Sequence, residues 1–515
     1  MQQPLRRNAA SSLGAVLLLL LATTHPLFAS ASTEMATEEK PVIQLMVGPV
    51  RIPLAADMYI IQDIGKRMNA TIEPINGDKK MLQTLIASRQ VPDLMYGNSI
   101  MSRLEALDYG PQGVLFPLDT KFDMMPNISR LRTEYKEWDA AMTANDGHQY
   151  VTPWVSEFPY FFYAPLISPK VRDYGIDPRT DIETFDDLYE IFKMFKNDHP
   201  DSHPWVTRRG LRSHLYIFGT DRRFYLNRFE DRYVFGPMEE TYRLMVEFMA
   251  KNYAEGLMHP DWFTMNEDPW RENMAAGKAF FTVDQFRQKT SLGGTPEDES
   301  SWWISFIVPK FHGTRYYTTD DYTHVNESIW KLSADTEHVD RILPFVDWQY
   351  TEEGSVWTMF GNVGETAERT DDGVRYLDIP EGVDAGTWAQ EQGMVVFRGA
   401  LQTRAVFFNR ARIKQAGGNL LALDLWEADI DYVEGSGTVR PAHPILTFAD
   451  DEFDSIKQLQ TDIETYASEN VIQFVTGQRP LSEWNDYVNE LKKLGVEEVI
   501  EIYSAAYERY AALVQ

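Results

Sequence analysis

Short apolar runs alternate with apolar helix faces near the start of the chain, and this alternation restricts the possible folds most. Residues 42–47 (VIQLMV) and 71–75 have the pattern of buried strands, and a third strand is expected at 91–95. Between these runs, apolar residues recur at steps of three and four over 58–68 and again over 81–86, as on one face of a helix. Strands that alternate with helices build βαβ units, so we predict an α/β fold with a parallel sheet.

Helices are also predicted much further along the chain. Apolar residues share one face over 184–195, where Thr184 is a suitable N-cap. Residues 481–491 are amphipathic, with Ser482 as the predicted N-cap and Gly495 as the stop just beyond the helix. A last helix is expected after this glycine and near the C-terminal end of the sequence.

The charge balance and the absence of cysteine exclude several classes of protein. Of 515 residues, 77 are Asp or Glu and 49 are Lys or Arg, which gives a net charge of −28. Such a chain lacks the positive field that nucleic acids and anionic membranes require, so we expect neither as a partner. Without cysteine it has no disulfide, no thiolate metal site, no thiol nucleophile and no lipidated cysteine. The length predicts two to four domains.

The N-terminal segment reads as an export signal. Two arginines precede an apolar run at 13–22, and Ala-Ser-Ala at 29–31 fits a cleavage site. The run is too short to cross about 30 Å of hydrocarbon. We therefore predict a signal peptide at 1–31, a flexible tether at 32–40, and an exported protein that is periplasmic or extracellular. Removal of the signal peptide, which carries two positive and no negative side chains, takes the net charge from −28 to −30.

Motifs of the common enzymes are missing from the sequence. It contains no phosphate-binding glycine loop, no serine nucleophile elbow and no HExxH zinc motif. His199 and His203 are spaced like a helical metal pair, but Pro200 and Pro204 interrupt that helix, which favours a surface turn. Two carboxylates could form a glycosidase pair, yet 77 candidates leave the choice open. We expect no enzyme, no cofactor and no metal site.

Tryptophans are the most informative side chains. Many of them stand beside polar or loop residues, a pattern typical of sites where a sugar ring stacks on an aromatic face while its hydroxyls pair with polar groups. For any single one of them, packing in a core or an interface is the alternative. The ten of interest are Trp154, Trp205, Trp262, Trp270, Trp302, Trp303, Trp330, Trp357, Trp388 and Trp426.

Several segments carry motifs that together resemble one family. They are QTLIASRQVPDLMYGNS at 83–99, DGHQYVTPW at 146–154, ETFDDLYEIFKMFKNDHPD at 183–201, GLMHPDWFT at 256–264 with WRENMAAGKAFF at 270–281, and the C-terminal hairpin at 474–510. The chain resembles extracellular solute-binding proteins of family 1, the substrate-capturing components of ABC importers. Within this family it is most similar to the large branch of alginate- and other oligosaccharide-binding proteins and LplA-type lipoproteins.

The resemblance implies two α/β lobes of the periplasmic-binding-protein type II fold, joined by crossing segments. The first lobe is expected to span 40–153 plus 303–360, and the second 154–302 plus 385–515, with a helical C-terminal hairpin. Ligand is expected in the cleft between the lobes, which close by a hinge motion. The closed form is expected to dock on the membrane permease, and the protein is expected to be a monomer.

The sequence departs from this branch in three places. Members of the branch often carry a calcium loop after the helix at 183–201, whereas 197–210 here has lost most oxygen ligands, so no calcium is expected. The lipoprotein cysteine is missing. Residues 361–386 are rich in Gly, Asp and Glu, read as a loop, and have no counterpart in the family pattern.

Candidate ligand contacts follow from position along the chain. Polar residues that end a strand of a parallel sheet lie where such sheets bind ligands. Others follow a predicted crossing, or end the AFFTVDQF strand that faces the cleft in families of this kind. An arginine beyond GMVVF could bind hydroxyls or a carboxylate through two hydrogen bonds. The predicted ligand-binding residues are Asn98, Trp154, Glu157, Asp284, Gln285, Phe286, Trp330, Trp388 and Arg398.

The favoured hypothesis is an extracytoplasmic binding protein that captures an oligosaccharide for an ABC importer. A binding protein for a peptide or another solute is the first alternative, and charged clamps in place of stacked tryptophans would distinguish it. A secreted carbohydrate hydrolase is a second alternative, which needs two cleft carboxylates at a catalytic separation. A sensory or adhesion role without a permease is the third.

Overall fold

The structure is a computed structural model of the chain. Residues Pro41–Gln515 form one compact unit. The predicted signal peptide and all of the tether except Lys40 lie outside the described residues. The structure describes residues 40–157, 163–208, 215–285, 292, 299–316, 318–319, 324–383, 385–394, 396–397, 400–403, 409–415, 428, 431–432, 435–436, 439–440 and 443–514.

A four-stranded sheet organises the N-terminal part of the chain, with the strand order β14-β3-β1-β2. The strands are β1 (Val42–Val47), β2 (Thr71–Asn76), β3 (Leu94–Tyr96) and β14 (Trp330–Leu332). β1 pairs in parallel with β2 and β3, and β14 joins the edge of β3 in the antiparallel direction. Leu45, Met46 and Val47 of β1 alternate between the two faces of the sheet and are all completely buried, as expected of a central parallel strand covered on both faces. The predicted strand–helix alternation and the α/β class are confirmed.

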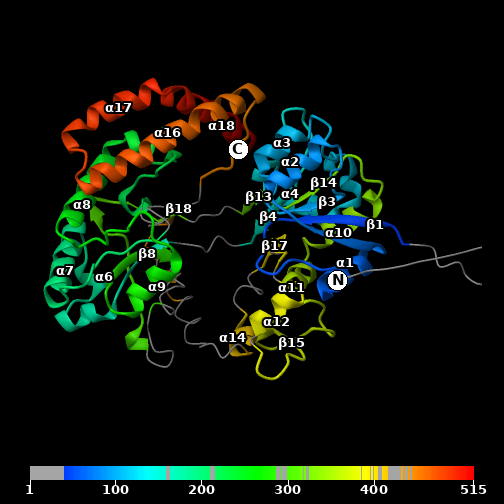
Figure 1. Ribbon diagram of the computed structural model, residues 1–515, viewed down its shortest axis with the longest axis horizontal. Coiled ribbons are helices and arrows are strands. Elements are labelled where there is room, and N and C mark those ends of the chain that lie inside the picture. Colours follow the sequence, from blue (N-terminus) through cyan, green and yellow to red (C-terminus); the bar gives the residue numbers. More distant parts are fainter. Residues whose placement is uncertain are drawn as a thin grey trace, which may run out of the picture. The chain divides into compact units, whose positions relative to one another are not determined.

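Helices and a late segment of the chain complete the first hydrophobic core, which draws on residues 43–155 and 325–401. The apolar face predicted over 58–68 is the inner face of α1. Figure 1 shows these elements from blue through yellow. They are α1 (Tyr59–Met68), α2 (Lys79–Ala87), α3 (Arg103–Tyr109), α4 (Pro126–Glu134), α5 (Glu137–Met142), α10 (Val339–Trp348), α11 (Glu352–Phe360) and α12 (Ala385–Glu391).

A second core draws on residues 163–311 and 456–499. Its sheet has the order β8-β5-β9, with antiparallel pairing throughout. The remaining strands form small ladders around it, and aromatic rings fill much of the space between them. The elements are β5 (Tyr163–Ile167), β6 (Phe224–Asn227), β7 (Arg232–Phe235), β8 (Phe281–Gln285), β9 (Ile304–Ser305), β10 (Lys310–Phe311), β11 (Thr314–Arg315), α6 (Pro178–Asp181), α7 (Phe185–Asp198), α8 (Glu240–Ala254) and α9 (Glu267–Ala275).

Helix α7 begins as the sequence predicts. The Thr184 hydroxyl accepts a hydrogen bond from the backbone N–H of Asp187 at 3.1 Å, and the Asp187 carboxylate accepts one from the N–H of Thr184 at 2.8 Å. This reciprocal pair is a capping box, which satisfies two backbone donors at the start of the helix. α7 ends at Asp198, and His199 caps it before Pro200.

The C-terminal helices α16 (Asp450–Thr476), α17 (Trp484–Lys493) and α18 (Val496–Val514) add their apolar faces to the second core. Figure 1 shows them in orange and red, with α16 beside α8. Gly495 adopts a φ of 90° and separates α17 from α18, as predicted. The prediction that Ser482 caps α17 is wrong, because Leu481–Glu483 forms a 3₁₀ turn and the helix starts only at Trp484.

Three segments run between the two cores, and a small sheet joins all of them. Strand β4 (Pro153–Ser156) leaves the first core, β13 (Val325–Ser328) returns to it, and β17 (Leu401–Gln402) leaves it again. β4 lies in the middle, antiparallel to β13 and parallel to β17. We call these three strands the junction sheet. Closer to the second core, β12 (Thr318–Thr319) pairs in parallel with β18 (Val439–Arg440).

The cores group two segments differently from the predicted lobe boundaries. Ile304, Phe306 and Phe311 pack in the second core, although 303–360 was expected in the first lobe. Residues between Ala385 and Leu401 pack in the first core, although 385–515 was expected in the second lobe. The lobe boundaries themselves stay a prediction.

One stretch has a different local structure from the one predicted. The loop expected over 361–386 contains a hairpin, β15 (Ala367–Thr370) with β16 (Gly373–Tyr376), and the first residues of α12. Among the residues described here, every helix is too short or too polar to cross a membrane.

Candidate functional site

A group of aromatic and polar side chains gathers at the end of the junction sheet. The backbone N–H of Ser156 donates to the carbonyl of His324 at 2.8 Å, and the N–H of Glu157 donates to the carbonyl of Gln402 at 3.1 Å. The ring of His324 stacks on Tyr135 with centroids 5.1 Å apart and planes 23° apart. Burial, together with Glu134 and Glu157, raises the pKa of Tyr135 to about 12, so this phenol stays protonated.

Asn98 and Glu327 extend this group toward the first sheet. The Asn98 amide donates to the exposed Glu327 carboxylate at 2.6 Å, and its carbonyl oxygen accepts from the N–H of Arg103 at 3.2 Å. Asn98 follows β3, at the carboxyl end of a parallel strand, where ligand sites are common. We call Asn98, Tyr135, Glu157, His324 and Glu327, together with Trp154 of the central strand β4, the junction cluster.

Two buried cations stand behind the junction cluster. The guanidinium of Arg103 donates to the carbonyl of Ala141 at 2.7 Å and to the carbonyl of Leu446 at 2.5 Å. The ammonium of Lys331 donates to the carbonyl of Gly97 at 2.9 Å. Burial lowers the pKa of Arg103 to about 10 and that of Lys331 to about 7, although nearby Glu327 opposes both shifts. Arg103 thereby ties α3 to the segment that precedes α16.

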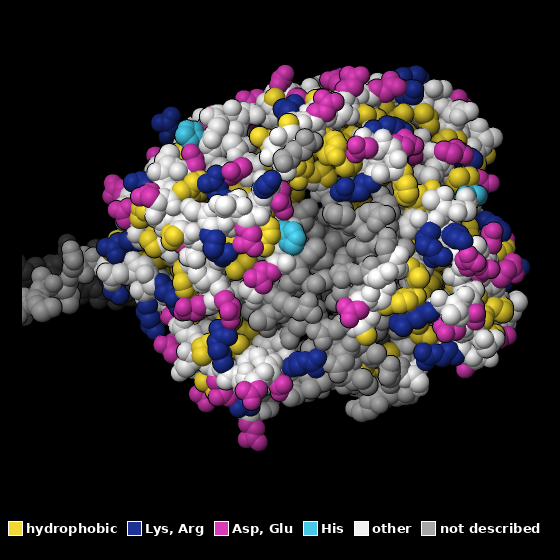
Figure 2. Space-filling view, turned by 180° about the vertical axis from the view of Figure 1, so that it is seen from behind, with side chains coloured by type: hydrophobic (Ala, Val, Ile, Leu, Met, Phe, Trp, Pro, Cys, Tyr) yellow, Lys and Arg dark blue, Asp and Glu magenta, His cyan; other side chains and the backbone are white. Residues whose placement is uncertain are grey.

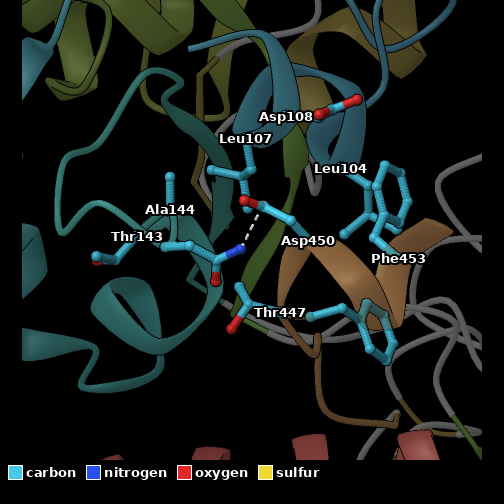
Figure 3. A pocket seen from close by; sticks show the side chains of 10 residues that line it. Leu104, Leu107, Asp108, Thr143, Ala144, Thr447, Asp450 and Phe453 are labelled. Atoms are coloured by element: carbon cyan, nitrogen blue, oxygen red, sulfur yellow. Dashed lines mark hydrogen bonds between the residues drawn. The ribbon is translucent and has the colours of Figure 1, made fainter. Parts of the chain in front are cut away.

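A small pocket lies beside this tie, between α3, the 143–145 turn and the start of α16 (Figure 3). The Asn145 amide donates to Asp450 at 2.7 Å, which is the dashed line of Figure 3. The cavity volume of 20 Å³ has room for about one water molecule but not for a sugar ring. This pocket is therefore a packing detail of the interface and not a ligand site.

A second cluster stands at the end of β8. The Arg208 guanidinium donates through Nε and Nη2 to the two oxygens of Asp284, at 2.6 and 2.8 Å, and through Nη1 to Glu267 at 2.7 Å. It also lies 4.7 Å from the centre of the Trp270 ring. Burial alone would lower the pKa of Arg208, but Asp284, Glu267 and Tyr163 raise it above its usual value. We call Tyr163, Arg208, Glu267 and Asp284 the strand-end cluster.

Chain connectivity limits how far apart the two clusters can be. Glu157 follows β4 in the junction cluster, and Tyr163 begins β5 in the strand-end cluster. Six residue steps span at most about 20 Å even when fully extended. Tyr163 also pairs directly with Gln285 at the end of β8. Both clusters therefore lie within the reach of one oligosaccharide-sized ligand, whatever the angle between the cores.

The structure brings five of the predicted ligand residues to these two places. Asn98, Trp154 and Glu157 belong to the junction cluster, while Asp284 and Gln285 end β8. Their contact with a ligand stays a prediction.

The other four predicted residues are placed differently or not described. Trp330 is completely buried, with its ring stacked on Phe397, and Trp388 packs against the first core beside Tyr376. Trp330 therefore has no surface open to a ligand, whereas Trp388 is half-buried and its contact with a ligand stays a prediction. Phe286 and Arg398 lie outside the described residues.

The sequence reasoning missed several members of the clusters. Tyr135 lies between α4 and α5, where nothing in the sequence marks it. His324 and Glu327 lie in the HVNES segment that precedes Trp330. Trp330 was selected as a ligand-binding residue and these two polar neighbours were not. Arg208 was not among the predicted ligand-binding residues, because its two carboxylate partners, Glu267 and Asp284, are far away in sequence.

Metal binding and charge add little to the site. Among the residues that the structure describes, no group of three or more potential ligands could hold a metal ion. His203 lies near His259 with ring centroids 5.0 Å apart, whereas His199 packs on Phe280.

On the face drawn in Figure 2, the described acidic side chains are interspersed with basic ones. The absence of a nucleic acid partner stays a prediction.

A larger pocket of 430 Å³ lies elsewhere, between α1, α11 and the turn that follows α11. Arg67 forms its floor, stacked 3.6 Å above the Trp348 ring and bound to Asp63 at 2.9 Å. None of the predicted ligand residues lines it. Arg67 also donates to Asn362, which in turn donates to Glu365, and we assign this pocket no ligand.

Comparison with known proteins supports the sequence resemblance. No family model matches the chain. The chain is 20% identical to the fructooligosaccharide ABC transporter substrate-binding protein FusA of Streptococcus pneumoniae, over 92% of this chain and 91% of that protein. The predicted resemblance to ABC importer binding proteins is thereby confirmed.

Solved structures agree with the predicted fold. The chain superposes on the alginate-binding protein AlgQ2 with a TM-score of 0.72 at 17% identity, over 92% of this chain and 99% of that one. The structure of FusA in complex with kestose superposes with a TM-score of 0.71 at 19% identity, with the same coverage of both chains. An HMO-binding, ABC-transporter-associated solute-binding protein of Bifidobacterium longum infantis superposes with a TM-score of 0.71 at 17% identity, over 92% of this chain and 99% of that one. The predicted two-lobe fold is confirmed.

We predict that the strand-end cluster depends on Arg208 for stability. Arg208→Met leaves the buried Asp284 without its partner, which should lower the free energy of unfolding by about 3–5 kcal/mol. Urea unfolding followed by tryptophan fluorescence measures this change. Arg130→Met, which removes an exposed pair with Glu134, should cost about 0.5 kcal/mol.

A double variant separates the charge effect from lost packing. Arg208→Met combined with Asp284→Leu removes both buried charges, so it should be more stable than Arg208→Met alone. If the double variant is the less stable of the two, the ion pair is not what holds this cluster together.

We also predict a pH dependence that comes from Lys331. Its folded-state pKa is about 7, against 10.5 for an ordinary lysine. Between these values the unfolded chain holds a proton that the folded protein has lost, so the free energy of unfolding should rise with pH across this window. Lys331→Met should remove that rise.

Urea midpoints of both proteins at about pH 6.5, 8 and 9.5 test this expectation. The free energy of unfolding of wild type minus that of the variant should increase as the pH rises, since wild type gains stability and the variant does not. Parallel pH profiles would show that Lys331 keeps its proton in the folded protein.

Proposed function

We propose that this chain is the extracytoplasmic substrate-binding component of an ABC importer and that it captures an oligosaccharide between its two lobes. One observation carries the proposal: all three segments that connect the cores are hydrogen-bonded into one sheet, and aromatic and polar side chains gather at its end. A connection of this kind allows two rigid bodies to rotate about a narrow waist and close on a ligand.

The chemistry of the clusters suits a carbohydrate. Trp154, Tyr135 and His324 offer flat rings for the C–H face of a sugar. Asn98, Glu157 and Glu327 offer hydrogen-bond partners for hydroxyl groups. The related FusA is named for fructooligosaccharides. The cation of the strand-end cluster, Arg208, is already bound by two carboxylates, which favours a neutral oligosaccharide over a uronate polymer.

We further propose that the protein is not an enzyme. A glycosidase needs one carboxylic acid that holds its proton and a second carboxylate across the scissile bond. Among the described cluster carboxylates, Asp284 and Glu267 are bound to Arg208, and Glu327 is bound to Asn98. Three of the four carboxylates in the two clusters are therefore already held by side chains of the protein itself.

The remaining parts of the proposal follow from the sequence. The predicted signal peptide at 1–31 directs export, and the sequence has no cysteine that could carry a lipid. We propose two lobes that meet at the junction sheet, a monomeric state, and delivery of the ligand to permease subunits when the lobes close. A peptide as ligand is the alternative, and the panel below includes it.

A thermal-shift panel on residues 32–515 tests the proposal. The probes are kestose, maltotriose, lacto-N-tetraose, alginate trisaccharide, glucose and a tripeptide. A ligand that binds only the folded protein adds about 2.7 kcal/mol of stability at 100 times its Kd, and this raises the Tm. We expect a shift with at least one neutral oligosaccharide and none with the tripeptide.

A matched pair of tryptophan variants connects binding to the junction cluster. Trp154→Ala and Trp348→Ala both remove a half-buried ring from the first core. Only Trp154→Ala should weaken binding of the sugar found in the panel, with Kd raised tenfold or more in isothermal titration calorimetry. A shift with the tripeptide alone would overturn the carbohydrate assignment, and a panel without any shift would overturn the proposed function.

A further inference from the structure

An exposed aromatic pair stands apart from both clusters, on the second core. Phe229 lies in the turn between β6 and β7, and 55% of its surface is exposed. The ring of Tyr316 meets it edge to face, with centroids 5.4 Å apart and planes 88° apart. Among the described residues, Phe229 is the one aromatic side chain within the group of exposed large apolar residues, which otherwise holds Val42, Met81, Val363, Val383 and Leu513.

The turn fixes the position of Phe229. The Asn227 side chain accepts a hydrogen bond from the backbone N–H of Phe229 at 3.1 Å, and the Asn227 carbonyl accepts from Glu230 at 3.2 Å. Asp231 completes the turn with a φ of 48°, in the left-handed region that most side chains avoid. These constraints hold the phenylalanine backbone in one conformation, so little entropy would be lost if the ring bound a ligand.

A glycine makes room for the second ring of the pair. A Cβ atom added to Gly219 would lie 2.0 Å from the Tyr316 ring, and Gly219 has a φ of 76°, so no other residue fits this position without rearrangement. The Gly219 carbonyl accepts a hydrogen bond from the hydroxyl of Tyr225 at 3.3 Å. Tyr316 is therefore held against a rigid backbone.

The pair lies where two of the connecting segments leave the second core. Tyr316 precedes β12 by two residues, and β12 pairs with β18. Further along the same segment, the ring of His443 lies 5.6 Å from that of Tyr225, which itself contacts Gly219. Contacts thus run without a break from the third connecting segment to Phe229.

Polar groups flank the rings, as they do in sites for sugars. Glu230 and Arg232 form an ion pair at 2.5 Å beside Phe229. Tyr507 donates to Asp231 at 3.5 Å. An apolar ring face bordered by charged hydrogen-bonding groups matches a pyranose or furanose, whose C–H face is apolar and whose edges carry hydroxyls. A protein partner would call for a broader apolar area, because stable interfaces bury several hundred Å² on each side.

We propose that the exposed ring of Phe229, which Tyr316 supports edge to face, is a platform on which one ring of the bound oligosaccharide stacks. This inference rests on the proposed function and adds a contact from the second core to those of the junction cluster. The platform binds the apolar face of the sugar ring, and Glu230 and Arg232 pair with its hydroxyls.

Calorimetric titration of the Phe229→Ala variant tests the platform, with the panel sugar that gives the largest thermal shift in wild type. We expect Kd to rise about tenfold, which corresponds to about 1.4 kcal/mol. Phe229→Trp keeps an aromatic face and should bind within twofold of wild type. Leu513→Ala, which trims a side chain that is 66% exposed on α18, is the matched control and should leave Kd unchanged.

A second measurement does not depend on truncating the ring. Incorporation of 4-fluorophenylalanine, with the signal of residue 229 assigned from Phe229→Leu, should show a ¹⁹F shift when that sugar is added. If wild type binds no sugar, the proposed function fails and the platform with it. If wild type binds while Phe229→Ala keeps its affinity and the ¹⁹F signal does not move, the platform alone is overturned.

Discussion

The hydrogen bonding of β4 to both of its neighbours is the constraint on which the rest of the structure depends. A chain that passes three times between two cores must satisfy the backbone groups of each passage. Here β4 bonds to β13 on one side and to β17 on the other, so the three passages form one ladder. This arrangement places Glu157, His324 and Gln402 next to one another, although they are far apart in sequence. The junction cluster is a direct consequence of the connectivity.

Buried charges hold the two clusters in place on either side of the junction. Arg103 uses its guanidinium on two backbone carbonyls, one of which belongs to the segment before α16. The Arg208 guanidinium donates hydrogen bonds to Asp284 and Glu267. Both arginines are thus bound by groups of the protein itself, which fits a role in positioning. We propose that the aromatic rings of the junction cluster, with the amide and carboxylate groups around them, bind a neutral polyhydroxylated molecule.

Much of the fold could be predicted from the sequence because it depends on local patterns. The alternation over 42–95 gave the parallel sheet, and the Thr184 capping box and Gly495 gave helix ends. Ser482 was misleading because a 3₁₀ turn precedes α17, and short-range patterns do not distinguish the two kinds of helix.

The site was harder to predict than the fold. Residues at strand ends, such as Asn98, Glu157 and Asp284, could be picked by position. Trp330 could not be distinguished from a ligand-stacking tryptophan, because its burial against Phe397 depends on a contact 67 residues away. Tyr135 and Arg208 were missed or undervalued for the same reason: their partners come from distant segments.

Closure of the two lobes around a ligand is the central claim, and small-angle X-ray scattering tests it most directly. The radius of gyration of residues 32–515 is measured without sugar and with a saturating concentration of the sugar identified by thermal shift. The account predicts a smaller radius of gyration for the sugar complex and no change with glucose or the tripeptide. An unchanged radius at a sugar concentration where calorimetry shows full occupancy would contradict closure at the junction sheet.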